Sequence, residues 1–350
     1  MKSWPVILLI LLTCSTAFEL SDYEKIDVET SILDSEEPQL TIYEDKIYVV
    51  YGIVDPHWDV YTSIYDIESL ELVKKVRLTN DPADNQFYPD ITCWNDKCGV
   101  IYDNQTAGSI WLQVWDKDFN ERLEMYRIAD LPPALTDPSI MSLENGIGYV
   151  SYAYASSYRS NMVTLEKWDL DEGVCIKQVN YTKNPGNTLL FTDLAWMGDN
   201  VLLCYNNYPT PLGECVLYTK DLEIVSDELM PDDNKYHTSL SYVECGGRDF
   251  FSSDYEGKGI SVFTCNGFLE CDSFGLDLPH TLYEYRRGNV IECYDNVLYS
   301  TFWTINYSNP GDEDVYLLVK EVEESVVELS LEYLWDYVKI LEYRINVLEG

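Results

Sequence analysis

Apolar and polar residues alternate along most of this chain, in short runs of the kind that form half-buried β-strands. Six of these runs end at a tight turn rich in Asn, Asp or Gly, the residues that tolerate hairpin geometry. The turns recur about 50 residues apart, and their central residues are Asp45, Asp96, Asn145, Asp199, Gly246 and Asp295. The chain therefore repeats one hairpin pattern six times.

Each turn is followed by a run of β-branched or aromatic residues, at 47–51, 99–102, 147–152, 201–205, 250–251 and 297–302. Pro38, Pro89 and Pro138 open alternating strands before several turns, and a proline is accepted at the first residue of a strand. Third strands are expected at 109–115 and 161–168, and fourth strands at 72–78 and 123–128. Four strands in a repeat of this length are typical of a β-propeller blade.

The last repeat lacks a fourth strand, because its third strand at 314–322 runs into a different pattern. Residues 25–33 alternate and lie just before the first repeat, so we expect them to complete the last blade and close the ring. The sequence thus predicts an all-β protein, a six-bladed β-propeller over residues 18–322 closed by an N-terminal strand.

Residues 323–350 change to a helical period and predict a C-terminal amphipathic helix. Its apolar positions follow a coiled-coil spacing: Val327, Leu331, Leu334, Val338, Leu341, Ile345 and Leu348. The stripe is wider than a two-stranded coil requires. Either the helix makes the protein a homo-oligomer, which we favour slightly, or it packs back onto the propeller.

Residues 1–17 resemble a secretory signal peptide, with Lys2 before a short apolar run at 4–12 and small residues up to Ala17. A lipid anchor at Cys14 is the alternative. No later stretch is apolar enough for a transmembrane segment. We therefore expect a secreted or cell-surface protein.

The formal net charge is −38, which opposes binding to nucleic acid or anionic lipid. This charge suits a cationic partner, bound divalent ions or simply solubility. Acidic loops with clustered oxygen ligands make calcium a candidate cofactor, and its candidate ligands are Asp81, Asp84, Asp90, Asp232, Asp233, Asp312 and Asp314. None of these loops has the spacing of an EF-hand.

The chain has ten cysteines, and an exported protein would be expected to pair them. Three pairs flank predicted hairpins: Cys93 with Cys98, Cys204 with Cys215, and Cys265 with Cys271. Cys245 and Cys293 occupy matching places in adjacent repeats and are expected to join them. Cys14 would leave with the signal peptide, so Cys175 remains alone. Three glycosylation sequons begin at Asn104, Asn180 and Asn306, each in a stretch expected to be a turn or loop.

The segments 77–81 and 87–91 join two predicted blades through a Leu-Thr ending and a proline. This junction resembles that of secreted propellers with TolB-like or sialidase-like repeats. The resemblance implies a fold and not an activity. Residues 252–257 come near a sialidase Asp box but place the glycine one residue late, and arginines are few. A catalytic sialidase is therefore disfavoured.

No catalytic centre is evident in the sequence. It contains no Gly-x-Ser-x-Gly elbow, and with 61 acidic residues any carboxylate pair is uninformative. The leading hypothesis is a non-enzymatic extracellular protein that binds a protein or glycan through its loop face. The alternatives are a secreted carbohydrate-active enzyme of the glycosidase or lyase type, with carboxylates at the mouth of the ring, and a structural component of a cell-surface layer.

Overall fold

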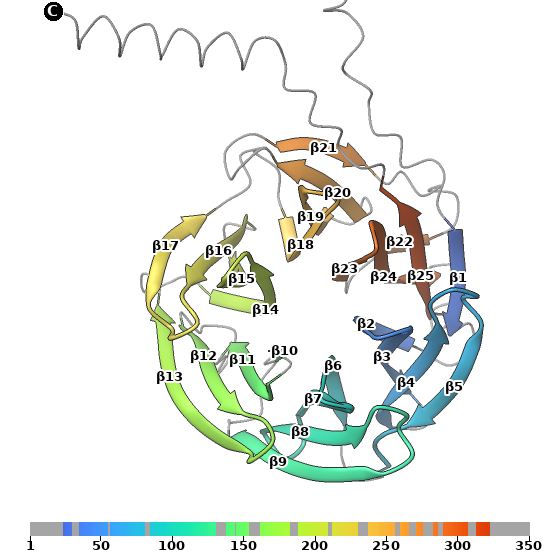
Figure 1. The fold of residues 1–350 in the computed structure, drawn as a ribbon, viewed down its shortest axis with the longest axis horizontal. Helices are drawn as coiled ribbons and strands as arrows, with labels where there is room; N and C mark the ends of the chain where they lie inside the picture. The colour runs from blue at the N-terminus through green and yellow to red at the C-terminus, as the bar shows by residue number, and fades with distance from the viewer. Residues whose placement is uncertain are drawn as a thin grey trace, which may run out of the picture.

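The computed structural model shows sheets arranged like blades around a central axis, as a β-propeller (Figure 1). It describes residues 24–29, 35–54, 57–80, 85–130, 138–143, 145–153, 162–182, 188–208, 212–229, 237–255, 260–265, 271–275, 283–285, 290–306 and 313–322. These residues form strands and turns and contain no helix. Within them there is accordingly no helix with the length and apolar character of a membrane span.

Five sheets are regular and have four antiparallel strands each, in chain order from the axis outward. Sheet 1 holds β2 (Ser35–Tyr43), β3 (Lys46–Val54), β4 (Trp58–Asp66) and β5 (Leu72–Arg77). Sheet 2 holds β6 (Gln86–Trp94), β7 (Lys97–Asn104), β8 (Ser109–Asp116) and β9 (Arg122–Asp130). Sheet 3 holds β10 (Ser139–Ser142), β11 (Ile147–Ala153), β12 (Met162–Asp169) and β13 (Val174–Thr182). Sheet 4 holds β14 (Thr188–Met197), β15 (Asn200–Tyr208), β16 (Leu212–Tyr218) and β17 (Ile224–Leu229). Sheet 5 holds β18 (His237–Cys245), β19 (Arg248–Tyr255), β20 (Ile260–Cys265) and β21 (Cys271–Gly275).

The remaining sheet is composite and joins the two ends of the described chain. It contains β1 (Glu24–Glu29), β22 (Tyr283–Tyr285), β23 (Val290–Tyr294), β24 (Val297–Asn306) and β25 (Glu313–Glu321). Both β22 and β23 pair with β24, because the chain before β23 contributes a short extra strand. The prediction of six equivalent four-strand blades is therefore corrected: five sheets are regular blades, and the last is a five-stranded composite.

Strand β1 closes the ring as the sequence predicted, because it pairs antiparallel with β25 from Glu24 opposite Val319 to Glu29 opposite Val315. The predicted signal peptide at 1–17, with Cys14, and the predicted helix at 323–350, with its seven apolar seam positions, lie outside the described residues.

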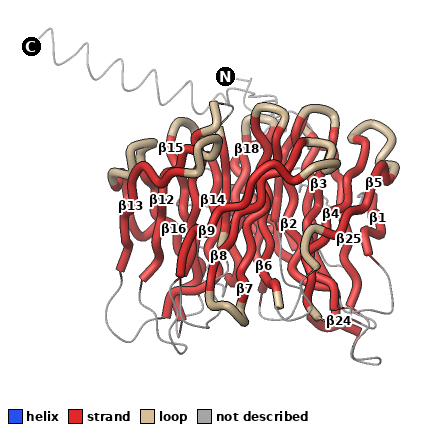
Figure 2. The backbone as a smooth tube through the Cα atoms, turned by 90° about the horizontal axis from the view of Figure 1, so that it is seen from below, coloured by secondary structure: helices blue, strands red, loops and turns tan. Residues whose placement is uncertain are grey.

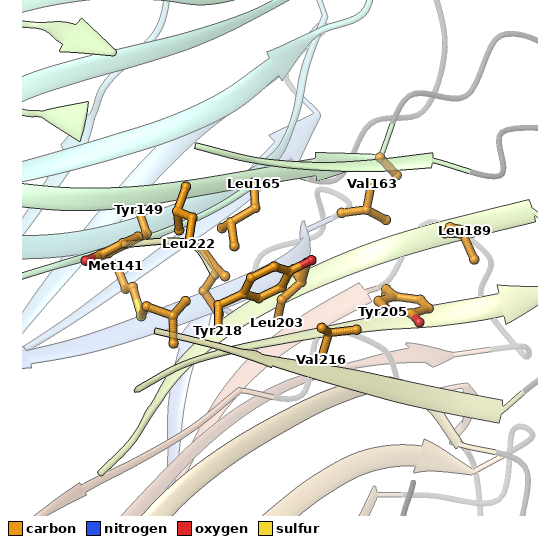
Figure 3. Packing of buried hydrophobic residues seen from close by; sticks show 13 residues of the cluster. Met141, Tyr149, Val163, Leu165, Leu189, Leu203, Tyr205, Val216, Tyr218 and Leu222 are labelled. Atoms are coloured by element: carbon orange, nitrogen blue, oxygen red, sulfur yellow. The ribbon is translucent and has the colours of Figure 1, made fainter. Parts of the chain in front are cut away.

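The apolar core is divided among the spaces between neighbouring sheets, one cluster to each space around the ring. Figure 3 shows the cluster between sheets 3 and 4, where Leu165 and Val163 of one sheet lie near Leu203 and Tyr218 of the next. A blade has two apolar faces and cannot bury both alone, so stacking around an axis is what stabilises it.

A buried tyrosine pairs with a polar side chain on the next strand in four consecutive sheets. Each tyrosine lies on the second strand and its partner on the third, so the hydroxyl is satisfied inside the core. The pairs are Tyr51 with Ser63 at 2.8 Å, Tyr102 with Gln113 at 3.0 Å, Tyr152 with Glu166 at 2.9 Å and Tyr205 with Glu214 at 3.1 Å. This repeat accounts for part of the high tyrosine content.

We expect Tyr152→Phe to lower the free energy of unfolding by about 1–3 kcal/mol. The change removes a donor from Glu166, whose buried carboxyl would keep only the Trp168 indole N–H at 2.7 Å. The matched control is Tyr48→Phe, because the Tyr48 hydroxyl is buried without a hydrogen-bond partner. Chemical denaturation should show that Tyr48→Phe leaves the free energy of unfolding unchanged or raises it. An equal loss of stability in both variants would contradict the account.

The tight hairpins gather at one face of the ring (Figure 2), where ion pairs link neighbouring sheets. Lys46 Nζ lies 2.6 Å from Asp118 Oδ1, which joins sheets 1 and 2. Lys97 reaches Asp171 at 2.6 Å, joining sheets 2 and 3, and Lys167 reaches Asp221 at 2.8 Å, joining sheets 3 and 4. Basic side chains are thus placed at the rim of this face.

Three disulfides are present. Cys93–Cys98 and Cys204–Cys215 each join paired strands within one sheet, and Cys245–Cys293 joins sheet 5 to the composite sheet. These are three of the four predicted pairs. For the fourth, the strand register sets Cys265 opposite Cys271, although their side chains lie outside the described part. Disulfides are typical of proteins that fold in oxidising compartments, which agrees with an extracellular protein.

Candidate active site at the axis of the ring

The innermost strand of every sheet carries one residue at an equivalent register. Five of these residues lie four positions before the last residue of their strand, and Ser139 lies three positions before the end of β10. They are Gln39, Asp90, Ser139, Asp193, Ser241 and Val290. Glu292 lies two residues beyond Val290, one step nearer the hairpin face. Asp90, Asp193 and Glu292 therefore come from separate sheets to one axis.

A β-bulge immediately precedes four of these equivalent positions, in β2, β6, β14 and β18. Bulges occur next to active sites, where they redirect a side chain. In β2 and β6 the bulge contains a residue with positive φ, Glu37 at 57° and Tyr88 at 52°, each followed by a proline. Pro38 and Pro89 therefore lie inside their strands, contrary to the prediction that they open them. A proline is tolerated there because the bulge needs no ladder donor.

The inner strands enclose a cavity of about 130 Å³ at the axis. All three carboxylates line it, together with Trp196, Tyr242 and aliphatic or hydroxyl side chains of the same strands. Among the described residues that line this cavity there is no Lys, Arg or His. Its negative groups therefore have no positive partner within the wall.

Asp90 is the least accessible of the three, with 7% of its surface exposed. The backbone N–H groups of Ile91 and Ile140 donate to its two oxygens, each at 2.7 Å. Because Ile140 belongs to the next sheet, the carboxylate also connects two blades. Burial raises the pKa of Asp90 to about 6, and these two donors oppose the rise.

Asp193 and Glu292 are half-buried at the cavity wall. Burial, followed by repulsion from Asp90, raises the pKa of Asp193 to about 7. Burial, followed by repulsion from Asp193 and then Asp90, raises the pKa of Glu292 to about 8. The three groups therefore titrate as one coupled set near neutral pH and cannot all be ionised together.

This set can do general acid–base chemistry. A pair of carboxyl groups whose environments separate their pKa values supplies one proton donor and one ionised base or nucleophile at the same pH. Carboxyl groups with pKa values near neutrality, gathered in a cavity, mark a candidate functional site.

Asp90 is the only calcium candidate that the structure places at this cavity. Asp314 lies in β25, and Asp81, Asp84, Asp232, Asp233 and Asp312 lie outside the described residues. Within the described ranges, no three His, Cys, Asp or Glu residues are grouped to hold a metal ion. A calcium site in the remaining loops stays a prediction.

The other predicted sites lie away from the axis. Cys175 is a free, exposed thiol on the outermost strand β13. The three sequon asparagines lie in strands, not in loops as predicted: Asn104 ends β7, Asn180 lies in β13 and Asn306 ends β24. Asn104 is 7% exposed and its side chain accepts the Ala107 N–H at 2.8 Å, which disfavours glycosylation there. Asn180 is exposed on the outer edge.

Sequence analysis missed the axial set. Asp90 entered only as a possible calcium ligand, and Asp193 and Glu292 were not singled out. A signal was present, because counting back from each hairpin sets Asp90 and Asp193 at the same place in their repeats. Glu292 lies two residues closer to its hairpin than this shared register, and no acidic residue occupies the position equivalent to Glu292 in the other repeats.

No protein-family profile matches this sequence, and a search of curated proteins finds no relative. Several solved structures share its fold. The Trypanosoma rangeli sialidase, solved with sialic acid, has a TM-score of 0.63 at 9% identity, over 93% of this chain and 62% of the sialidase. This chain thus spans less than two thirds of that protein's length.

Two further structures extend the likeness. The subtype N11 neuraminidase-like protein of A/flat-faced bat/Peru has a TM-score of 0.56 at 8% identity, over 86% of this chain and 95% of that one. An exo-β-1,3-galactanase from Phanerochaete chrysosporium, solved with β-1,3-galactotriose, has a TM-score of 0.52 at 11% identity. The match covers 68% of this chain and 62% of the galactanase. At these identities the likeness shows the β-propeller fold alone.

The leading functional hypothesis from the sequence, a non-enzymatic binding or display protein, is wrong by this comparison. The similar structures are glycosidases and neuraminidase-like proteins. The hypothesis failed because it rested on the lack of a visible catalytic motif. Carboxyl groups that meet only at the axis of a ring leave no local motif.

Proposed function

We propose that this protein is a glycoside hydrolase whose reaction takes place at the axial cavity. The observation that carries the proposal is the convergence of Asp90, Asp193 and Glu292 on one cavity, with pKa values raised toward neutrality. Glycoside hydrolysis uses two carboxyl groups, one protonated and one ionised, on either side of the bond that breaks. The likeness to glycosidase propellers supports this assignment.

Glu292 is the proposed acid, because its pKa is the highest of the three and it retains its proton at neutral pH. It donates that proton to the glycosidic oxygen as the bond to the anomeric carbon breaks. Asp193 is the proposed partner, since after burial it does most to raise the pKa of Glu292. Ionised Asp193 either activates a water or attacks the anomeric carbon. Asp90, fixed by two backbone donors, keeps the local potential negative.

The size of the cavity limits how much of a sugar can enter it. An engineered protein cavity of about 150 Å³ holds one benzene ring, and the axial cavity is about 130 Å³. A hexose is larger than benzene, so the cavity receives part of the sugar and the rest lies outside it. Trp196 in its wall offers aromatic surface against a sugar ring.

We further propose that the composite sheet acts as a sixth blade. Its strands β23, β24, β25 and β1 pair in that order, as the four strands of each regular blade do. This arrangement supports Glu292 as an inner-strand residue of the ring. The three disulfides support action outside the cytoplasm.

The direct test is release of reducing sugar from a panel of neutral, amino and acidic oligosaccharides and chromogenic glycosides. We expect turnover of at least one class. The matched control is Asp193→Asn, which should lose activity while keeping its fold. No turnover of any substrate by the wild-type protein, or equal turnover by the variant, would contradict the proposal.

The rate should have a bell-shaped pH dependence with its maximum between about pH 7 and 8. Activity rises as Asp193, with its pKa raised to about 7, loses its proton, and falls as Glu292, with its pKa raised to about 8, loses its own. A pH profile of kcat/KM on the best substrate measures both limbs. A maximum below pH 5 would show that these groups do not act as assigned.

A further inference from the structure

The axial cavity holds one carboxylate more than hydrolysis requires. Two carboxyl groups serve glycoside cleavage, which in the proposed function are Glu292 and Asp193, and Asp90 remains. No basic side chain among the described lining residues balances Asp90. Lys46, Lys97 and Lys167 instead pair with acidic residues of the hairpin face. Asp90 accepts two backbone N–H hydrogen bonds, but no described residue of the cavity wall supplies a positive charge to balance it.

Ser139 adds a polar group beside this charge, just behind the residues that line the cavity. It lies at the equivalent register on β10, between the strands that carry Asp90 and Asp193. Its side chain is 3% exposed and its Oγ makes no hydrogen bond of normal geometry. It is nevertheless close enough to lower the pKa of both Asp90 and Asp193. A buried hydroxyl without a partner costs free energy unless a ligand satisfies it.

A protonated primary amine fits these groups. It carries one positive charge and three N–H donors, whereas each carboxylate oxygen and the serine hydroxyl can accept a hydrogen bond. Its charge would relieve the repulsion among the three carboxylates. An acidic sugar would add negative charge beside the ionised carboxyl groups, and the described residues that line the cavity include no cation to receive it.

We propose that the axial cavity selects an amino sugar, with the protonated amine held by Asp90 and Ser139 beside the charge of Asp193. The proposal rests on the proposed function and deepens it, because it takes the cavity as the place where the sugar substituent enters. It also separates this chain from its structural neighbour solved with sialic acid, which is an acidic sugar.

The test compares four methyl glycosides that differ only in one substituent: a free amine, an N-acetyl group, a hydroxyl group and a carboxylate. Both gluco and galacto series are used. Binding to the full-length wild-type protein is measured by calorimetry at pH 6 in an amine-free buffer, and proton release is followed in weak buffer. We expect the amine to bind at least tenfold more tightly than its N-acetyl form and to displace protons from the carboxyl set. The carboxylate form should not bind.

The matched variants are Ser139→Ala and Ser151→Ala. Ser151 is also a buried serine whose Oγ lacks a partner, but it lies on β11, one strand farther from the axis, opposite Ser139. Ser139→Ala should weaken amine binding about tenfold, the effect of one lost hydrogen bond to a charged group. Ser151→Ala should not change it, and thermal unfolding checks that both variants fold.

Equal binding of the amine and N-acetyl forms, or no binding of any form, would overturn the inference. Hydrolysis of neutral glycosides alongside that result would leave the proposed function standing. Preferential amine binding without hydrolysis of any glycoside would support the amine site and refute the hydrolase. The preference for the amine over the N-acetyl form is measured on the wild-type protein, so this test stands even if a variant fails to fold.

Discussion

Replacing Glu292 by Gln should reduce turnover by at least about a hundredfold, the usual contribution of a positioned general acid. The substitution keeps the shape of the side chain but removes the proton that the leaving oxygen needs. The loss should appear in kcat more than in KM, because the acid acts in the transition state. Glu68→Gln is the matched control, since Glu68 is exposed in a turn of sheet 1.

The same variant should be more stable than the wild-type protein at alkaline pH. The folded pKa of Glu292 is raised from 4.5 to about 8, so the folded state holds a proton that the unfolded chain releases between these values. Stability from this group is therefore present below pH 4.5 and is lost as pH rises through 8. At pH 9 the variant should gain about 2–4 kcal/mol.

Thermal unfolding at pH 5 and pH 9 measures this difference. The melting temperature of Glu292→Gln should exceed that of the wild-type protein only slightly at pH 5 and by several degrees at pH 9. Glu68→Gln should show no such trend with pH. A variant that is inactive and also unstable at both pH values would show that Glu292 has a structural role. Full activity would remove it from the mechanism.

Removing the Cys245–Cys293 disulfide should cost about 4 kcal/mol, against about 2 kcal/mol for Cys93–Cys98, on the loop-entropy account. The first pair is separated by 48 residues and the second by 5, so the first restricts the unfolded chain far more. It also joins sheet 5 to the composite sheet, next to Glu292 in β23. Its loss should therefore lower activity as well as stability.

The two double alanine variants should be compared by chemical denaturation without reductant and by their activity at the pH optimum. Cys93→Ala with Cys98→Ala serves as the control, because that pair closes a single hairpin of sheet 2. Equal losses of stability, or normal activity after removal of Cys245–Cys293, would show that this bond does not hold the composite sheet in place.

Local patterns in the sequence sufficed to predict the β-propeller, but not the make-up of its last sheet. Hairpin residues, strand alternation and repeat length gave the β-propeller, and the leftover alternating stretch at the start gave the pairing of β1 with β25. The extra strand β22 was not predicted, because its three residues, Tyr283–Tyr285, are too few to show a period. Three cysteine pairs were predictable because hairpin partners and matching repeat positions face each other.

The candidate site was harder to predict, because it depends on where a ring closes. Asp90 and Glu292 are far apart in sequence and meet only when the composite sheet returns beside sheet 1. The bulges that precede Asp90 and Asp193 change the direction of the inner strand without altering its alternation enough to be recognised. In a chain with 61 acidic residues, only this geometry distinguishes the three that matter.

The central physical claim is that three carboxyl groups at the axis share protons near neutral pH. A carbon-13 NMR titration of the Asp and Glu side-chain carboxyl groups tests it most directly, in the wild-type protein and in Glu292→Gln. We predict coupled steps between about pH 6 and 8 for Asp90, Asp193 and Glu292, well above ordinary carboxyl groups. In Glu292→Gln, one titration step disappears and the pH at which Asp193 titrates changes. Titration of every carboxyl group below about pH 5 would contradict the account.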